Sequence, residues 1–331
     1  MRSLRRSHPP ITHSLIEDSG WLKKHLIFLN FANNSYRNHT TMKVSGFTFI
    51  KNAVLYDYPI VEAIRSILPL CDEVVVAVGK SDDSTLELIR GIGDPKIKII
   101  ETVWDESLRE GGRVLAVETD KAFAAIAPDS DWAFYIQGDE VIHEKYHTPI
   151  REAMEKYLNQ KDVDGLLFNY LHFYGSYDYV GSSSNWYPHE IRVIRNNPSI
   201  YSYRDAQGFR MGESQKLKVK PVDAYVYHYG WVKPPEAMQR KQENFQKLWH
   251  SDQWVDENVP AVTSFDYEKH VSSLQPFQDT HPLVMQQRID ATNWKFDFDI
   301  SFSRTTTKDR LKRILKKFFG LDFSYRNYRI I

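Results

Sequence analysis

The sequence contains a single cysteine, Cys71, among its 331 residues. One thiol excludes an intrachain disulfide framework, and it also excludes metal or redox sites built on paired cysteines. Charge of one sign does not dominate, because 43 basic residues balance 43 acidic ones. The net charge therefore gives no general argument for binding nucleic acid. Hydrophobic residues make up 42% of the chain, which is typical of a globular protein with a sizeable core.

Long apolar runs are missing as well. The longest candidate, residues 26–31, is far shorter than the ~18 residues of a membrane-spanning helix. It follows a polar leader that contains Glu17 and Asp18, which is unlike a signal peptide. We therefore expect a cytoplasmic protein. Residues 1–41 show no helix or strand period, so we expect a disordered extension or a wrongly assigned start codon, with an ordered N-terminal element as the alternative.

From Met42 onward, short apolar runs alternate with helical patterns. The runs predict strands over residues 43–50, 73–78, 96–103 and 132–136. The patterns between them predict a helix capped by Asp57 with Pro59 in its first turn, and helices over 84–90 and 113–127. This alternation predicts a parallel sheet with helices on both faces. Ligands of such sheets bind beyond the carboxyl ends of the strands, here near Asn52, 79–83 and 137–140.

The second half of the chain differs from the first in its sequence pattern, with short strands that are rich in aromatic residues. We predict a helix over 150–158, capped by Thr148 with Pro149 at its first position. Aromatic-rich strands are expected over 165–174, 190–194 and 224–228. Helices are expected over 234–249 and over 276–293, the latter with a turn around Pro282. A basic amphipathic helix is predicted over 304–319. We therefore expect one domain over 42–300, made of the halves 42–149 and 150–300, and a C-terminal segment over 301–331.

Two carboxylates follow the fourth predicted strand. The segment reads Tyr135-Ile-Gln-Gly-Asp-Glu-Val141, so Asp139 and Glu140 lie in the loop beyond the end of the strand. Carboxylates at such a place suit a hard divalent cation, Mg²⁺ or Mn²⁺, which is held by few protein ligands together with substrate phosphates. The alternative is that these acids cap the next segment.

This segment resembles the pattern of glycosyltransferase family 2 on a GT-A fold, in which the fourth strand ends in Asp-x-Asp or Asp-x-Asp-Glu. Gln137 stands where the first aspartate usually is, while Asp139 and Glu140 match the rest. Further matches follow the order of the family from 43 to 249. They are the asparagine-ended loop 49–52, the stretch 81–85, Arg113 at the start of the helix before the fourth strand, and the histidine segment 227–231 late in the chain.

The resemblance implies an α/β fold with a GT-A-type, mostly parallel sheet flanked by helices and a smaller mixed β region on the acceptor side. It implies a nucleotide-sugar donor and a glycan or lipid-linked acceptor, with 42–149 as the nucleotide-sugar half. It implies a cation, Mn²⁺ or Mg²⁺, on Asp139, Glu140 and His228. The donor-binding residues that it implies are Asn52, Ser81, Asp82, Asp83, Arg113, Gln137 and Gly138.

Two positions depart from the family pattern. Gln137 is neutral, so the metal site carries less negative charge than usual. Val78 and Gly79 replace the aspartates that often contact uridine, which leaves the nucleotide base open. These departures suggest an alternative function, a non-catalytic sugar-nucleotide or glycan-binding protein.

Inverting transfer also needs a base that takes the proton of the acceptor hydroxyl. The glycine-rich loop 205–213 offers two carboxylates, Asp205 as the first choice and Glu213 as the second. Both are equally compatible with a role as ordinary loop caps.

Three further features have competing interpretations. His143-Glu-Lys-Tyr-His147 matches the zinc peptidase signature, which needs a helix, whereas Thr148 and Pro149 predict that the helix starts only after the motif. The aromatic stretch 170–186 suits either stacking on sugar rings or packing in the core. The helix over 304–319, with seven basic residues and one acid up to Lys317, either docks on the domain or contacts an anionic membrane surface.

Overall fold

A computed structural model describes residues 41–108, 110–183, 186–259, 262–271, 273–300 and 326–331. The chain divides into two units, Met1–Thr41 and Met42–Ile331, and nearly all of the described residues belong to the second unit. The predicted leader, apart from Thr41, and the predicted basic helix over 304–319 lie outside the described residues. Both stay predictions.

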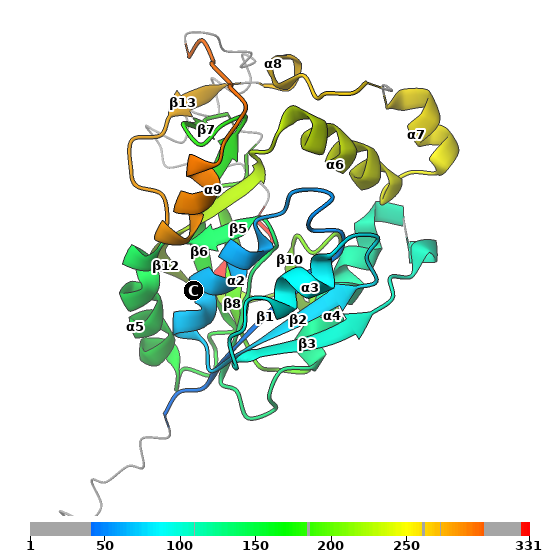
Figure 1. Ribbon diagram of the computed structural model, residues 1–331. Helices are drawn as coiled ribbons and strands as arrows, with labels where there is room; N and C mark the ends of the chain where they lie inside the picture. Colours follow the sequence, from blue (N-terminus) through cyan, green and yellow to red (C-terminus); the bar gives the residue numbers. More distant parts are fainter. Residues whose placement is uncertain (1–40, 109, 184–185, 260–261, 272, 301–325) are drawn as a thin grey trace, which may run out of the picture. The chain divides into compact units, whose positions relative to one another are not determined.

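Four parallel strands form the first half of the main sheet, in the order β3-β2-β1-β4. Figure 1 labels β3, β2 and β1 side by side. Each strand lies within one residue of its predicted bounds, so the predicted β/α alternation is confirmed. The bounds of these strands and of the helices between them are β1 Val44–Ile50, α2 Ile60–Ile67, β2 Glu73–Gly79, α3 Thr85–Arg90, β3 Ile97–Thr102, α4 Arg113–Ala124 and β4 Trp132–Tyr135.

Both faces of this half of the sheet are covered. Val74, Val76 and Val78 of β2 belong to a core that includes residues of α2 and of α5 (His147–Tyr157). Val75 and Ala77 point to the opposite face and pack with α4 and with a small antiparallel sheet. That sheet consists of β9 Ile200–Tyr203, β10 Gly208–Met211 and β11 Gln215–Lys216. Burial on both faces explains why the strand reads as a continuous apolar run.

Beyond β4 the main sheet becomes mixed. β8 runs antiparallel to both β4 and β6, whereas β12 runs parallel to β6 and pairs antiparallel with the short strand β5. The bounds are β5 Glu140–Ile142, β6 Gly165–Tyr174, β7 Tyr179–Gly181, β8 His189–Arg195, β12 Lys218–Trp231 and β13 Leu274–Pro276. A parallel half with helices on both faces, followed by a mixed half and accompanied by the small antiparallel sheet, confirms the predicted α/β fold class.

The C-terminal residues that are described belong to the same sheet. β14 (Arg329–Ile330) pairs parallel with Lys218 and Val219 at the start of β12. Tyr328 packs in the same core cluster as Ile200 and Phe209 of the small sheet, and Arg210 donates a hydrogen bond of 2.6 Å to the carbonyl of Asn327. The sequence did not predict this strand.

The helices of the second half agree only in part with the prediction. α6 (Pro235–Lys247) confirms the predicted helix 234–249. The predicted helix 276–293 is wrong over its first part, because Leu274–Pro276 forms β13 on the edge of the sheet and Pro282 then precedes a single 3₁₀ turn, Leu283–Met285. Only α9 (Gln286–Asp290) is α-helical there. α7 (Asp252–Asn258) and α8 (Tyr267–His270) were not predicted.

Two predicted helix caps are also wrong. α5 begins at His147, before the predicted cap Thr148, and Tyr146 occupies the cap position. α2 is preceded by Pro59 without a side-chain cap, while Asp57 binds Arg288 at 2.5 Å instead. Among the described residues, no helix is both long enough and apolar enough to cross a membrane.

Candidate active site at the ends of β1 and β4

The candidate site lies between two neighbouring strands, β1 and β4, where the strand order of the sheet reverses. From β1 the chain moves to β2 and β3 on one side, and it then returns to β4 on the other side of β1. In α/β sheets, ligands bind beyond the carboxyl ends of the strands at such a switch point. Asn52 follows β1 at this edge, and residues 137–140 follow β4.

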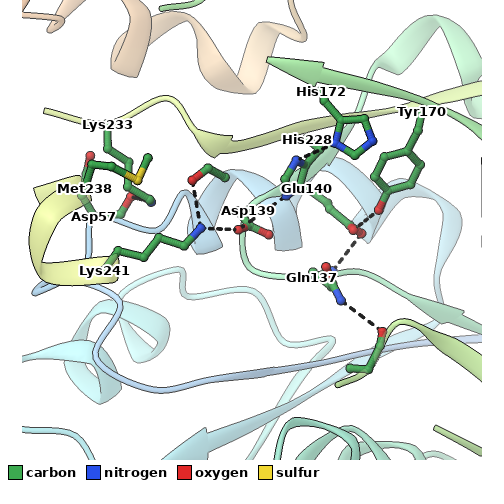
Figure 2. Close-up of polar contacts among 12 residues, drawn as sticks. Asp57, Gln137, Asp139, Glu140, Tyr170, His172, His228, Lys233, Met238 and Lys241 are labelled. Carbon is green, nitrogen blue, oxygen red and sulfur yellow. Dashed lines mark hydrogen bonds and ion pairs between the residues drawn. The ribbon is translucent and has the colours of Figure 1, made fainter. Parts of the chain in front are cut away.

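Asp139 is the central charge of this site (Figure 2). Its Oδ2 atom lies 3.2 Å from Nζ of Lys241 and 3.8 Å from Nε2 of His228. Burial by itself would raise the pKa of Asp139, but the nearby basic groups, Lys241 first among them, together outweigh this effect and hold the pKa well below its usual range. Asp139 is therefore ionised at neutral pH, which a ligand for a cation must be.

Two lysines that follow β12 approach the ring of Tyr58. The ammonium group of Lys241, on α6, lies 5.1 Å from the ring centroid and donates a hydrogen bond of 2.8 Å to the carbonyl of Gly230. Lys233 lies 4.4 Å from the same centroid and donates to the carbonyl of Asp57 at 2.5 Å. Burial, together with the charge of Lys241, lowers the pKa of Lys233 well below its usual value. Lys241 is thus the cation that faces Asp139.

His228 reaches the site from β12, where it lies between two paired strands. It stands opposite Glu140 of β5 on one side and opposite His172 of β6 on the other. The Nδ1 atoms of His228 and His172 are 3.2 Å apart. Burial lowers the pKa of His228 to about 4 and that of His172 to about 3, so both rings are neutral at neutral pH. A neutral imidazole is the form that binds metal ions.

Gly230 borders the space next to Asp139 and His228. A Cβ atom on Gly230 would lie 2.6 Å from Nε2 of His228 and 2.7 Å from Oδ2 of Asp139. Both distances are shorter than any normal contact, so a side chain here would collide with the two polar atoms. The glycine therefore leaves these atoms accessible to a small ligand.

Glu140 points away from Asp139 and into the protein. Its oxygens accept hydrogen bonds from Nε and Nη2 of Arg192, at 2.7 and 2.6 Å, and a further bond from the hydroxyl of Tyr170. Glu140 and Arg192 are both at most 1% exposed. This geometry makes Glu140 one half of a buried ion pair, and among the described residues it favours Asp139 and His228 over Glu140 as metal ligands.

Gln137 connects the loop after β4 to the loop that carries Asp205. Its Nε2 atom donates to the carbonyl of Ala206 at 3.2 Å. Burial raises the pKa of Asp205, which is the direction that suits a general base. Glu213 is exposed in the turn between β10 and β11. The structure therefore brings the first of the two predicted bases close to Gln137 and leaves the second at the surface.

Four of the predicted donor-binding residues meet in the loops after β1 and β2. The backbone N–H of Asn52 donates to Oγ of Ser81 at 3.0 Å, and its side chain exchanges two hydrogen bonds with Asp82, at 3.1 and 2.8 Å. Asp83 accepts from the backbone of Leu55 at 2.7 Å. These side chains hold the two loops together at the switch point, and their predicted contact with a donor stays a prediction.

The remaining donor positions differ in their surroundings. Arg113 is exposed at the first residue of α4. Gly138 is closely packed, since a Cβ there would lie 2.9 Å from Cδ1 of Ile50. At the end of β2, the indole of Trp104 lies against Gly79, and a Cβ on that glycine would come within 2.4 Å of Nε1. Gly79 thus leaves room for the indole ring.

The zinc peptidase motif lacks the helical geometry that this chemistry needs. His143 precedes a 3₁₀ turn, Glu144–Tyr146, and its Nε2 atom lies 2.8 Å from Oγ1 of Thr280. His147 is the first residue of α5 and contacts the carbonyl of Ser66 at 2.8 Å. The two imidazoles therefore bind different partners instead of sharing one face of a helix. The prediction that His147 lies in a loop is wrong, because α5 starts there.

The residues at Asp139 fit a divalent cation with few protein ligands. Within the described part of the chain, no cluster of three or more His, Cys, Asp or Glu side chains is placed to hold a metal ion. Mg²⁺ and Mn²⁺ sites that also bind phosphates need only one or two protein ligands, however. Asp139 and His228 present two such atoms, and the ammonium of Lys241 shows that Asp139 accommodates a cation. The cation itself stays a prediction.

Several residues of the site escaped the sequence analysis. Lys241, Lys233 and His172 were not singled out, because each comes to the site from a distant part of the chain. His172 offered the only local signal: a polar residue between Tyr170 and Tyr174 on one side of a mostly buried strand. Buried polar side chains in such strands usually have a specific partner.

The comparisons with known proteins give matches of low similarity. No family model and no curated protein matches the chain. Among solved structures it is similar to S. aureus TarS, at 15% identity and a TM-score of 0.36, over 62% of this chain and 39% of that chain. TarS 1–349 in complex with UDP matches at 14% identity and 0.36, over 62% and 65%. A glucosyl-3-phosphoglycerate synthase from Mycobacterium tuberculosis, in complex with Mn²⁺, UDP and phosphoglyceric acid, matches at 17% and 0.27, over 40% and 44%. The matches span less than two thirds of these chains, and at this level they carry no argument about function.

Proposed function

We propose that this chain is a glycosyltransferase that moves a sugar, of the hexosyl type, from a nucleotide-sugar donor to a hydroxyl group of a glycan or a lipid-linked sugar. The observation that carries the proposal is the position of Asp139. It is an ionised, almost fully buried carboxylate at the switch point of the sheet, with Lys241 and His228 beside it. The resemblance of 137–140 to the family 2 motif adds the substrate class.

The donor diphosphate binds, in this mechanism, at the positive side of the site. Lys241 donates to Asp139 and Gly230, and an ammonium group has three protons, so one remains for a phosphate oxygen. Asp139 and His228 are the residues that would hold Mn²⁺ or Mg²⁺. When bound, the cation supplies positive charge for the leaving diphosphate.

The acceptor hydroxyl attacks the anomeric carbon, and its proton passes to a carboxylate, for which Asp205 is the candidate. The new bond joins the acceptor oxygen to the anomeric carbon, and the bond from that carbon to the diphosphate oxygen breaks. Attack from the face opposite the leaving group inverts the anomeric configuration. The raised pKa of Asp205 makes it a stronger base than an ordinary aspartate.

A screen of nucleotide sugars tests this function. Thermal unfolding is measured with each sugar nucleotide, with Mn²⁺ and with EDTA, and the release of nucleoside diphosphate is measured with the ones that bind. Asp139→Ala is expected to abolish Mn²⁺-dependent donor binding. Asp162→Ala, which changes an exposed aspartate, is the matched control and should bind like the wild type. Unchanged donor affinity of Asp139→Ala in calorimetry would contradict the assignment.

Gln137→Asp tests the departure from the family motif. A second carboxylate in the loop after β4 adds an anionic group to the motif, so Mn²⁺ should bind more tightly. Weaker binding would indicate instead that the amide of Gln137 has a task of its own. One such task is visible, since Gln137 holds the carbonyl of Ala206.

A non-catalytic sugar-nucleotide or glycan-binding protein is the second candidate function. The neutral Gln137 favours it, because it reduces the charge available for metal-assisted chemistry. So does the indole of Trp104, which lies at the end of β2 where the family often has aspartates. The same screen separates the two functions: a binding protein shows a thermal shift but releases no nucleoside diphosphate.

A further inference from the structure

Two hydrogen bonds connect the backbone to His172 and His172 to His228, and the far side of the His228 ring faces Asp139. Nε2 of His172 lies 2.9 Å from the carbonyl oxygen of Tyr187. A carbonyl only accepts hydrogen bonds, so Nε2 of His172 carries a proton. The ring is buried, and its two nitrogens face a carbonyl and another imidazole instead of a carboxylate, an environment that favours the neutral form. In that form Nδ1 of His172 has no proton and acts as an acceptor.

The proton between the two rings must then belong to His228. The two Nδ1 atoms are 3.2 Å apart, and a contact at this distance needs one N–H between them. His172 has none to give there, so Nδ1 of His228 is the donor. In a neutral ring this leaves the lone pair on Nε2, the atom that lies 3.8 Å from Oδ2 of Asp139.

We propose that His172 is a positioning residue that fixes the tautomer of His228, so that the Nε2 lone pair of His228 and the carboxylate of Asp139 together form a ligand pair for a divalent cation. This assignment rests on the proposed function, because the cation is the one that accompanies the donor diphosphate. In other proteins, a metal-binding histidine is oriented by a hydrogen bond from the ring nitrogen that does not bind the metal. The partner of that nitrogen is usually a carboxylate, a carbonyl or a water. Here the partner is another imidazole.

The opposite tautomer of His228 loses contacts without gaining any. With the proton on Nε2, two unprotonated Nδ1 atoms would face each other at 3.2 Å inside the protein. An unpaired polar group inside the protein destabilises the folded state. The new N–H would point toward Asp139 across 3.8 Å, which is too long for a hydrogen bond.

Aromatic neighbours keep the ring of His172 in the orientation that this role needs. The centroid of His172 lies 4.4 Å from that of Tyr187 and 5.0 Å from that of Trp186. The rings of His172 and His228 meet nearly edge to face, with an interplanar angle of 72°. Figure 2 shows the rings of His172 and His228 next to each other, with His172 on the side away from Lys241.

Nuclear magnetic resonance measures the tautomer directly. Long-range ¹H–¹⁵N correlations of the full chain, labelled with ¹⁵N in the histidine rings, distinguish a proton on Nδ1 from one on Nε2. We expect the Nδ1–H form for His228 and the Nε2–H form for His172. Replacement of His172 by phenylalanine removes the acceptor, so His228 should lose the pure Nδ1–H pattern. A Nε2–H pattern for His228 in the wild type overturns the inference.

Binding of Mn²⁺ alone, followed by electron paramagnetic resonance, gives the second readout. His172→Phe should weaken Mn²⁺ binding about 10- to 100-fold, the usual effect of losing such a partner. His172→Asn keeps an acceptor oxygen near the position of Nδ1 and should retain most of the affinity. His250→Phe makes the same replacement at a histidine that stacks on Trp254, and should bind Mn²⁺ like the wild type. Equal affinity of the wild type and both His172 variants overturns the inference.

The tests distinguish a failure of the inference about His172 from a failure of the proposed transferase function. A wild type that transfers sugar but shows the Nε2–H form of His228 overturns the inference and leaves the transferase standing. A His172-dependent Mn²⁺ site in a protein that neither binds nor converts any sugar nucleotide supports the inference and overturns the proposed function.

Discussion

Replacement of Gly230 by alanine tests the geometry of the site without removing any of its polar groups. Gly230 lies in β12, and its backbone is outside the left-handed region, so alanine is compatible with its conformation. The added Cβ would lie 2.6 Å from Nε2 of His228 and 2.7 Å from Oδ2 of Asp139, whereas ordinary contacts begin at 3.4 Å. The two side chains must therefore move by about 0.8 Å.

This displacement should affect function much more than stability. The atoms that move are the ends of two side chains, so the fold accommodates them and the midpoint of thermal unfolding stays close to that of the wild type. Misplacement of reacting groups by about 1 Å costs about 10²-fold in rate. We therefore expect Gly230→Ala to lower the turnover of the donor by about 10²-fold and to weaken Mn²⁺ binding.

The assay follows release of nucleoside diphosphate together with calorimetric titration of Mn²⁺. Gly91→Ala is the matched control, because Gly91 is exposed at the end of α3, where the nearest atom to an added Cβ is 3.2 Å away. It should behave like the wild type in both measurements. A Gly230→Ala protein with wild-type turnover and Mn²⁺ affinity would refute the placement of the active site at Asp139 and His228.

Three further predictions concern the carboxylates of the second half and their partners. Asp205→Asn should lower turnover by about 10²–10⁴-fold with little change in donor affinity, while Glu213→Gln stays active; an inactive Glu213→Gln would exchange the two roles. Arg192→Met leaves Glu140 buried without its cation, so the free energy of unfolding in urea should fall by about 3–5 kcal/mol, and a fall of less than about 1 kcal/mol would contradict the buried pair. Burial raises the pKa of Glu190 to about 8, so between pH 5 and 8 the folded chain keeps a proton that the unfolded chain loses, and stability falls as the pH rises. Glu190→Gln should make that fall less steep in thermal unfolding at several pH values, and parallel curves would count against this pKa.

The first four strands could be predicted closely because their signal is local. Glu73–Gly79 is a continuous apolar run after its first residue, and such a run needs no knowledge of the rest of the chain to be identified as a buried strand. The same holds for Gly165–Tyr174, whose bounds were predicted without error. In contrast, β13 exists because Leu274–Pro276 pairs with β7, a contact between residues far apart in the sequence.

The site was predictable only as far as its own loop. Asp139 and Glu140 are neighbours of the same chemical type, and no pattern in the sequence distinguishes their roles. Successive residues of an extended segment point to opposite sides, so one carboxylate faces Lys241 and the other faces Arg192 in the core. Lys241 is 102 residues from Asp139 along the chain, and only the packing of α6 brings it there.

The strand β12 links the last residues of the chain to the site. It pairs with β14 at Lys218 and Val219, and twelve residues after the first pairing Gly230 borders the site. Between Pro221 and Tyr225 its register against β6 shifts, and from Tyr225 to His228 the pairing is regular again. An insertion or deletion of one residue after Tyr225 would turn His228 to the opposite face of the sheet and put a tyrosine in its place. Variation in length among related chains should therefore collect in the turns on either side of this strand, and the stretch from Tyr225 to Gly230 should keep a constant length.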